Sequence, residues 1–233
     1  SLEQTAGVCI HFTSDDRGLD AVSNAGFKWL RRDLTWGSVE STVGVYNFTA
    51  FDNLYNSLTA RGLKILFIVD YGHPYHTGGS KYPPTNATQL AAWSNFAKAC
   101  ATRYKGKGVS YEIWNEPNIP GFWSNAPNAN HYAKVALTAL AAIRSVDTNS
   151  LVMTAGLAGM DWPFLTNVLR YNGAKGFGGI GIHPYRPGAS ETVVDDLIYM
   201  KSLVKNSIPT GTPPLYVTEC GYSTAWYTNA ATN

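Results

Sequence analysis

Hydrophobic runs typical of β-strands recur along the chain and alternate with segments of helical period. Each run is rich in β-branched or aromatic residues and is bounded by Gly, Pro or Asn. The predicted strands are 7–12, 27–34, 63–71, 108–115, 150–156, 178–185 and 214–220. Apolar residues spaced by three or four predict helices over 52–61, 88–104, 130–146 and 191–205.

Repeated β-then-α units with nearly continuous apolar strands indicate a parallel sheet covered by helices. No Gly-x-Gly-x-x-Gly sequence follows the first strand, which disfavours a dinucleotide-binding sheet. We therefore predict an α/β fold of the (β/α)8 TIM-barrel type, forming one domain over residues 1–233. Seven β/α units are visible, and only residues 220–233 follow Glu219. The eighth unit is expected to be missing, so that the barrel is incomplete at its C-terminal end.

An incomplete barrel leaves its first and seventh strands without a second neighbour. Unpaired strand edges tend to recruit another strand. We therefore expect these two strands to close on each other, to lower the stability of the chain, or to pair in a homodimer.

Composition narrows the function. The chain is 45% hydrophobic and 15% charged, with a net charge of +2, so it has no electrostatic footprint for nucleic acid. No apolar run reaches 18 residues, and no membrane span is expected. Three cysteines without close spacing argue against a disulfide framework or a zinc site. Asn-x-Thr sequons at Asn47 and Asn86 favour a secreted or extracellular protein, although this chain carries no signal peptide.

Polar residues gather where the predicted strands end, which is where barrel enzymes place their chemistry. These residues are His11, Arg31, Arg32, His73, Asn115, Glu116, His183, Tyr185 and Glu219.

Two of them, Glu116 and Glu219, suit cleavage of a glycosidic bond, because one carboxyl protonates the leaving oxygen while the other attacks the sugar carbon. Glu116 is the candidate general acid/base, and burial or a neighbouring negative charge would have to raise its pKa. Glu219 is the candidate nucleophile, kept ionised by Tyr185 and an arginine of the second strand. Glu112 is expected to be structural and paired with Arg31 or Arg32.

Four segments carry a resemblance to a known group of enzymes: WLRRDLTWGSVESTVGVYNF (29–48), WNEPN (114–118), IGIHPY (180–185) and TECG (218–221). At these residues the chain resembles clan A of the glycoside hydrolases, the retaining (β/α)8 glycosidases, and in particular families 39 and 5. The resemblance implies Asn115-Glu116 as the acid/base pair and Glu219 as the nucleophile.

The resemblance also implies substrate-binding residues. Arg31 is selected on the second strand, with Arg32 as the alternative, and His73, His183 and Tyr185 follow the third and sixth strands. Asn115 is expected to bind the sugar 2-hydroxyl. The aromatic floor that the clan supplies from its eighth strand is absent, and Trp226 is its candidate substitute.

The sequence therefore predicts a retaining β-glycosidase acting on β-linked poly- or oligosaccharides, with no metal or cofactor. Its two carboxyl groups should lie about 5–5.5 Å apart. The loops 72–86 and 117–129 would build a groove, with Tyr75, Tyr82 and Trp123 contacting sugar. The alternative is a catalytically impaired, carbohydrate-binding barrel fragment. A metal-dependent hydrolase is disfavoured, because the histidines form no ligand motif.

Overall fold

The computed structural model describes residues 2–187 and 189–222, and its strands form two parallel sheets. The first sheet contains, in spatial order, β1 (Gly7–Cys9), β2 (Trp29–Thr35), β3 (Lys64–Asp70), β4 (Ser110–Ile113) and β5 (Val152–Thr154). The second contains β6 (Leu157–Ala158), β7 (Ile180–His183) and β8 (Leu215–Val217). Every strand pair is parallel, as predicted. Of the eight, only the two-residue β6 was not predicted.

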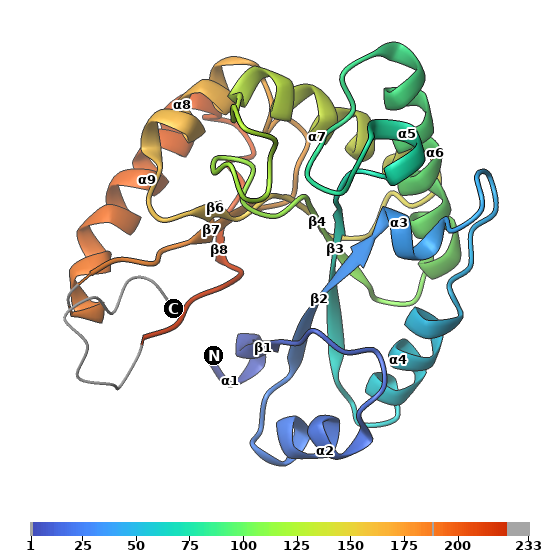
Figure 1. The fold of residues 1–233 in the computed structure, drawn as a ribbon. Coiled ribbons are helices and arrows are strands. Elements are labelled where there is room, and N and C mark those ends of the chain that lie inside the picture. Colours follow the sequence, from blue (N-terminus) through green and yellow to red (C-terminus); the bar gives the residue numbers. More distant parts are fainter. Residues whose placement is uncertain (1, 188, 223–233) are drawn as a thin grey trace.

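The two sheets form one curved wall. A parallel bridge joins Met153 to Gly179, and the Thr154 amide donates to the Gly179 carbonyl at 3.1 Å, so the β7 segment continues beside β5. Figure 1 shows the strands curving around a centre with the helices outside, and β1 and β8 at the two ends of the curve. The carboxyl ends of all these parallel strands therefore face the same rim.

Helices connect the strands. The described helices are α1 (Leu2–Thr5), α2 (Asp16–Asn24), α3 (Trp36–Val39), α4 (Thr49–Thr59), α5 (Pro74–Thr77), α6 (Ala87–Tyr104), α7 (Ala129–Arg144), α8 (Trp162–Arg170) and α9 (Val193–Ser207), with a 3₁₀ turn η1 at Ser190–Thr192. The four predicted helices correspond to α4, α6, α7 and α9. The longer helices α2 and α8 were not predicted, although each begins at an aspartate whose side chain accepts a backbone N–H.

The main core lies between the first sheet and α4, α6 and α7. It holds the fully buried side chains of Trp36, Trp93, Trp114 and Trp123. Large aromatic side chains bury much apolar surface, so their packing contributes strongly to the stability of this half of the wall. A smaller core under β7 and β8 is built around α8 and α9.

Strands β1 and β8 each pair on one side only within the described residues, with β2 and β7 respectively. One weak contact joins their ends, from Cys9 Sγ to the Thr218 carbonyl at 3.8 Å. The free edges that the sequence predicted are therefore present in the described part of the chain, and the homodimer stays a prediction. None of the described helices has both the length and the apolar character needed to cross a membrane.

Candidate active site

A cleft of about 350 Å³ opens at the carboxyl ends of the strands. Its lining comprises Cys9, Ile10, His11, Arg31, Asp33, Thr35, Ile68, Tyr71, Asn115, Glu116, Phe122 and Glu219. A second cleft of about 320 Å³ lies at the opposite end, around Trp29, Lys64 and Lys107, and no carboxylate lines it. Because barrel chemistry belongs to the carboxyl end, the first cleft is the candidate active site.

Strand β2 directs Arg31 into this cleft. Successive side chains of a strand point to opposite faces, so Arg31 and Asp33 share the interior face while Arg32 takes the other. Arg32 donates instead to the Phe12 carbonyl and to Asp33. Of the two arginines that the sequence left open, the structure places Arg31 in the site.

Arg31 is the centre of the site's hydrogen-bond network. Its Nε donates to Glu112 Oε2 at 2.8 Å and its Nη1 to Glu219 Oε2 at 2.8 Å. Its Nη2 donates to Glu112 Oε1 at 3.2 Å and to Asn115 Oδ1 at 2.8 Å, and Nη1 also contacts Cys9 Sγ at 3.9 Å. All five N–H groups of the guanidinium are therefore directed at protein acceptors.

Glu112 is the buried partner that the sequence predicted for an arginine of β2, and its side chain is 0% exposed. Burial alone would raise the pKa of the Glu112 carboxyl, but Arg31, followed by His183 and the Gly156 amide, outweighs burial and holds that pKa below its usual value. Glu112 therefore stays charged and keeps Arg31 in place.

The backbone turn at the end of β4 directs the Glu116 side chain into the cleft. The strand stops at Ile113, and Trp114 and Glu116 both adopt the left-handed region, with φ of 73° and 45°. Such values are strained for residues other than glycine and persist where packing enforces them. Trp114 is fully buried in the helix-facing core, so it does not share the site face with Glu112 and Glu116.

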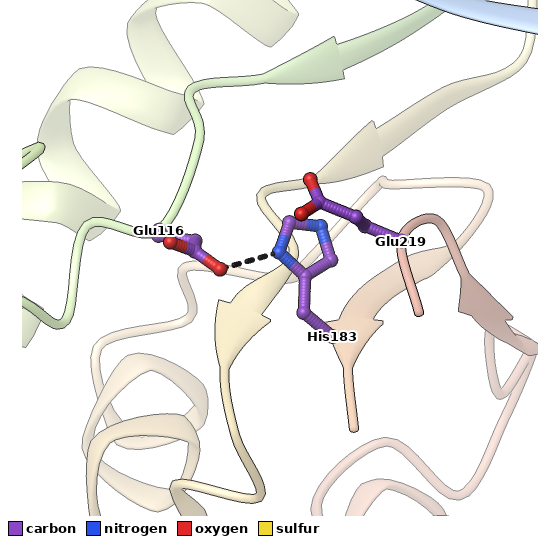
Figure 2. Close-up of side chains that lie close together, drawn as sticks. All are labelled: Glu116, His183 and Glu219. Carbon is purple, nitrogen blue, oxygen red and sulfur yellow. Dashed lines mark hydrogen bonds and ion pairs between the residues drawn. The ribbon is translucent and has the colours of Figure 1, made fainter. Parts of the chain in front are cut away.

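His183 lies between the two candidate catalytic glutamates (Figure 2). Its Nδ1 is 2.8 Å from Glu116 Oε1, and its Nε2 is 3.0 Å from Thr218 Oγ1 and 3.3 Å from Arg31 Nη2. One carboxylate oxygen from each of Glu116 and Glu219 and one ring nitrogen of His183 all lie within 4.8 Å of one another. The ring is fully buried, so it supports Glu116 from within the protein.

Thr218 links Glu112 to His183. Thr218 Oγ1 donates to Glu112 Oε1 at 3.2 Å, because a carboxylate can only accept. The His183 ring then connects Thr218, through Nε2, to Glu116, through Nδ1.

Glu219 has a different environment from Glu116. Its Oε2 accepts from Arg31 and its Oε1 accepts from the Tyr185 hydroxyl at 2.8 Å. Burial, then the hydrogen bond and charge of Glu219, raise the pKa of the Tyr185 hydroxyl, which therefore keeps its proton and donates. Both predicted donors to Glu219 are in place, and both favour its ionised form.

Asn115 is oriented by two neighbours. Its Oδ1 accepts from Arg31, and its Nδ2 donates to the Tyr71 hydroxyl at 3.3 Å. The second N–H of the Asn115 amide has no partner among residues 2–187 and 189–222 and is available to a ligand in the cleft.

Two predicted substrate-binding residues are structural instead. His73 Nδ1 accepts from the Tyr75 and His76 amides, and its Nε2 donates to the Glu40 carbonyl at 2.7 Å, so neither nitrogen is available to a sugar. Trp123 is 0% exposed, which excludes stacking on a sugar ring.

The predicted groove loops do expose aromatic rings, because Tyr75 is 74% and Tyr82 41% exposed. The remaining predicted aromatic, Trp226, lies outside the described residues.

The sequence prediction missed Thr218, Gly156 and the pair Asp33 and Asp70. Thr218 holds His183, and the Gly156 amide donates to Glu112 Oε1 at 2.7 Å while its carbonyl accepts from the Glu116 amide at 3.1 Å. Thr218 precedes Glu219 directly, and Asp33 lies two residues after Arg31, so strand alternation could have placed Asp33 on the same face.

Glu116, His183 and Glu219 are also the described residues that could hold a metal ion. The Arg31 guanidinium, 2.8 Å from Glu219, already supplies the positive charge there and would repel a cation. The donor set therefore fits acid–base chemistry better than metal binding.

The chain is similar to known glycoside hydrolases. A family model described as Cellulase (glycosyl hydrolase family 5) matches residues 3–231. A curated β-xylosidase from Geobacillus stearothermophilus is 25% identical over an alignment of 144 residues that covers 54% of this chain and 27% of that protein.

Solved structures show the same fold. A family 39 glycoside hydrolase from Bacteroides cellulosilyticus matches with a TM-score of 0.74 and 20% identity over 94% of this chain and 50% of its own. A monomeric β-xylosidase from Caulobacter crescentus matches with a TM-score of 0.76 and 20% identity over 96% of this chain and 55% of its own. An endoglucanase from Thermotoga maritima matches with a TM-score of 0.64 and 19% identity over 93% of this chain and 75% of its own.

The chain thus spans about half the length of the first two structures. The likeness confirms the predicted TIM-barrel fold class. Because the family model matches nearly the whole chain, the chain belongs to the cellulase family, glycosyl hydrolase family 5.

Proposed function

We propose that this chain is a retaining β-glycosidase, with Glu116 as general acid/base and Glu219 as nucleophile. The observation that carries the proposal is the short approach of the two carboxyl groups, which place an oxygen each within 4.8 Å of one another. Retaining enzymes keep their carboxyl groups about 5–5.5 Å apart, whereas inverting enzymes need about 6.5–9.5 Å to admit a water.

The asymmetric surroundings support the division of roles. Glu219 accepts from a guanidinium and a phenol, which favour the charged form that a nucleophile needs. Glu116 instead contacts the His183 ring at 2.8 Å, and an imidazole can give or take a proton, which suits a partner of a general acid/base.

The reaction then runs in two balanced steps. In the first, a Glu219 oxygen bonds to the anomeric carbon, and the Glu116 proton passes to the departing glycosidic oxygen. In the second, ionised Glu116 takes a proton from water, and the water oxygen bonds to the anomeric carbon and releases Glu219. The free Asn115 N–H would bind the sugar 2-hydroxyl in both steps.

The substrate class we propose is a β-linked oligo- or polysaccharide. The names of the related proteins, β-xylosidase and endoglucanase, support β-linked pentose or hexose units. The exposed rings of Tyr75 and Tyr82 offer stacking surfaces beyond the cleft.

The proposal is tested by incubating the protein with a panel of 2-deoxy-2-fluoro β-glycosides that carry good leaving groups. We expect an intact-mass increase of one fluorosugar, mapped to Glu219 by peptide analysis and absent in Glu219→Gln. A second variant, Glu116→Ala, should release the sugar slowly from activated substrates and faster with azide, which needs no general base. A folded protein that forms no adduct with any glycoside would overturn the proposal and favour the binding-only alternative.

A further inference from the structure

A second pair of carboxyl groups, Asp33 and Asp70, lies beside the proposed catalytic pair. They stand on neighbouring parallel strands, with Asp33 opposite Ile68 and Thr35 opposite Asp70 in the β2–β3 register. Asp33 lines the cleft that also contains Glu116 and Glu219, and its side chain is 18% exposed. Asp70 is 0% exposed, one residue before Tyr71 of the cleft wall.

Asp70 has no hydrogen-bond donor within the described chain. Both of its carboxylate oxygens are buried and unpartnered. The strand register puts the Asp33 carboxyl diagonally beside Asp70, and that carboxyl contributes to the raised pKa of Asp70. Two carboxyl groups can bond only if one of them is protonated, and the buried member is the one whose ionisation costs more.

The charges around Asp70 agree with this assignment. Burial, followed by the charge and hydrogen bond of Asp33, raises the pKa of Asp70 well above its usual value, and Glu112 acts in the same direction. Arg31 opposes the shift, but its guanidinium is already shared between Glu112 and Glu219. Burial and the neighbouring Asp33 carboxyl therefore favour the protonated form of Asp70, which could donate to Asp33.

Asp33 retains acceptor capacity toward the cleft. Its Oδ2 accepts from Arg32 Nη1 at 2.9 Å, and the His11 ring nitrogen is 3.8 Å away. A carboxylate accepts about four hydrogen bonds, so Arg32 and Asp70 do not saturate it.

Among the described residues, the cleft offers no free guanidinium to pair with an anion. Arg31 has committed all of its N–H groups to protein acceptors, and Arg32 is turned to Phe12 and Asp33. A sugar carboxylate placed here would meet Asp33 without a free guanidinium to pair with.

We propose that Asp33 is a specificity-determining residue that accepts hydrogen bonds from hydroxyl groups of the bound sugar, with Asp70 as the positioning residue behind it. The site thereby selects neutral, hydroxyl-bearing sugar units and rejects uronic acids. This inference rests on the proposed function, because it assumes that the cleft binds a sugar. A site that binds a sugar hydroxyl through a partly buried acceptor discriminates strongly against the sugar that lacks this hydroxyl, because the acceptor is then left unpaired.

The test compares wild type with Asp33→Asn, Asp70→Asn and Asp70→Leu. Binding of a neutral β-linked disaccharide and of its uronic acid counterpart is measured by titration calorimetry, and the rate of fluorosugar labelling of Glu219 is measured in parallel. We expect Asp33→Asn to weaken neutral binding about 10- to 100-fold, the loss of a charged hydrogen bond, and to reduce the preference over the uronic acid. Asp70→Asn keeps a donor to Asp33 and should bind within about twofold of wild type, whereas Asp70→Leu should resemble Asp33→Asn.

Wild type alone gives a further test that needs no variant to fold. In a series of monodeoxy disaccharides, removal of the hydroxyl that Asp33 accepts should cost about tenfold or more in affinity, and wild type should bind the uronic acid at least about tenfold more weakly than the neutral sugar. Equal binding of the neutral and uronic disaccharides by wild type, or unchanged neutral binding in Asp33→Asn, would overturn the inference. Labelling of Glu219 at the wild-type rate in Asp33→Asn would overturn it while leaving the proposed function intact. Loss of sugar binding in Asp33→Asn without any labelling of wild type would support the inference and reject the glycosidase.

Discussion

The Arg31 guanidinium donates two hydrogen bonds to the Glu112 carboxylate, with Nε 2.8 Å from Oε2 and Nη2 3.2 Å from Oε1. Both side chains are buried, at 7% and 0% exposed. The remaining N–H groups of Arg31 reach Glu219 and Asn115, so one buried ion pair sets the position of a proposed catalytic group and of a proposed sugar-binding amide. Strand β4 is thereby tied to β2 and to the end of β8.

Arg31→Ala should be strongly destabilising, because it leaves the Glu112 charge buried without its partner. Breaking a buried ion pair from one side costs about 3–5 kcal/mol. The free energy of unfolding, measured by urea denaturation, checks this value. Arg32→Ala is the matched control on the same strand, and its partly exposed pair with Asp33 should cost about 1 kcal/mol or less. Equal losses in the two variants would contradict the central role of Arg31.

Tyr185→Phe should impair reaction more than folding. The change removes one charge-assisted hydrogen bond to Glu219 Oε1 and leaves the aromatic ring in place. Such a bond is worth about 1.5–3 kcal/mol, so kcat/KM should fall roughly 10- to 100-fold while the unfolding midpoint changes little. Steady-state kinetics on an activated aryl β-glycoside measures the loss. Tyr75→Phe, on a ring that is 74% exposed, should retain wild-type kinetics on this small substrate.

Gly156→Ala should displace His183. A Cβ at position 156 would lie 2.0 Å from His183 Nε2, and the ring is fully buried, so it has no room to yield. Overpacking of this kind costs about 1–3 kcal/mol of stability. Because His183 bonds Glu116 through Nδ1, we also expect a loss of proton transfer to the leaving group. The rate should therefore fall more for a poor leaving group than for a good one.

The control for this variant is Gly121→Ala, where an added Cβ meets no heavy atom within 4 Å. It should retain both stability and the wild-type dependence on the leaving group. A Gly156→Ala protein with an equal loss for all leaving groups would mean that His183 does not act through Glu116.

Strand positions and the meeting of Glu116 with Glu219 could be predicted from the sequence, because apolar runs mark strands and parallel strands end at one rim. The choice of Arg31 came from the family resemblance, with Arg32 left as the alternative, and strand alternation agrees with it. The structural roles of His73 and Trp123 could not be predicted, because their burial and hydrogen bonds depend on how the loops after β3 and β4 pack. The left-handed turn at Trp114 is likewise set by tertiary packing rather than by local sequence.

The pair Asp33 and Asp70 was missed for a different reason. The two residues are 37 positions apart (70 − 33) and lie diagonally across two strands, so their contact depends on the β2–β3 register. Strand periodicity predicts which face a side chain takes, but not how far one strand is shifted along its neighbour. A buried carboxyl beside another carboxyl became visible only once that register was known.

Asp70→Asn should stabilise the protein increasingly as the pH rises. The pKa of Asp70 is raised in the folded state by burial and by Asp33, with Glu112 adding to the shift and Arg31 opposing it. In the unfolded chain it titrates near 3.9. Between these two pKa values the folded state holds one proton more than the unfolded state, so the stability of wild type falls as the pH rises, by up to about 1.4 kcal/mol per pH unit. Asparagine does not titrate and keeps a donor to Asp33, so the free energy of unfolding of the variant should not show this decrease with pH.

The expected difference is therefore small below about pH 4, where Asp70 is protonated in both states, and grows toward neutral pH. Urea denaturation of wild type and Asp70→Asn across this range measures it directly. Asp195→Asn, on an exposed residue of α9, is the control and should give a curve nearly parallel to wild type. Parallel curves for Asp70→Asn and wild type would show that Asp70 ionises normally in the folded protein, and the shared proton behind Asp33 would have to be abandoned.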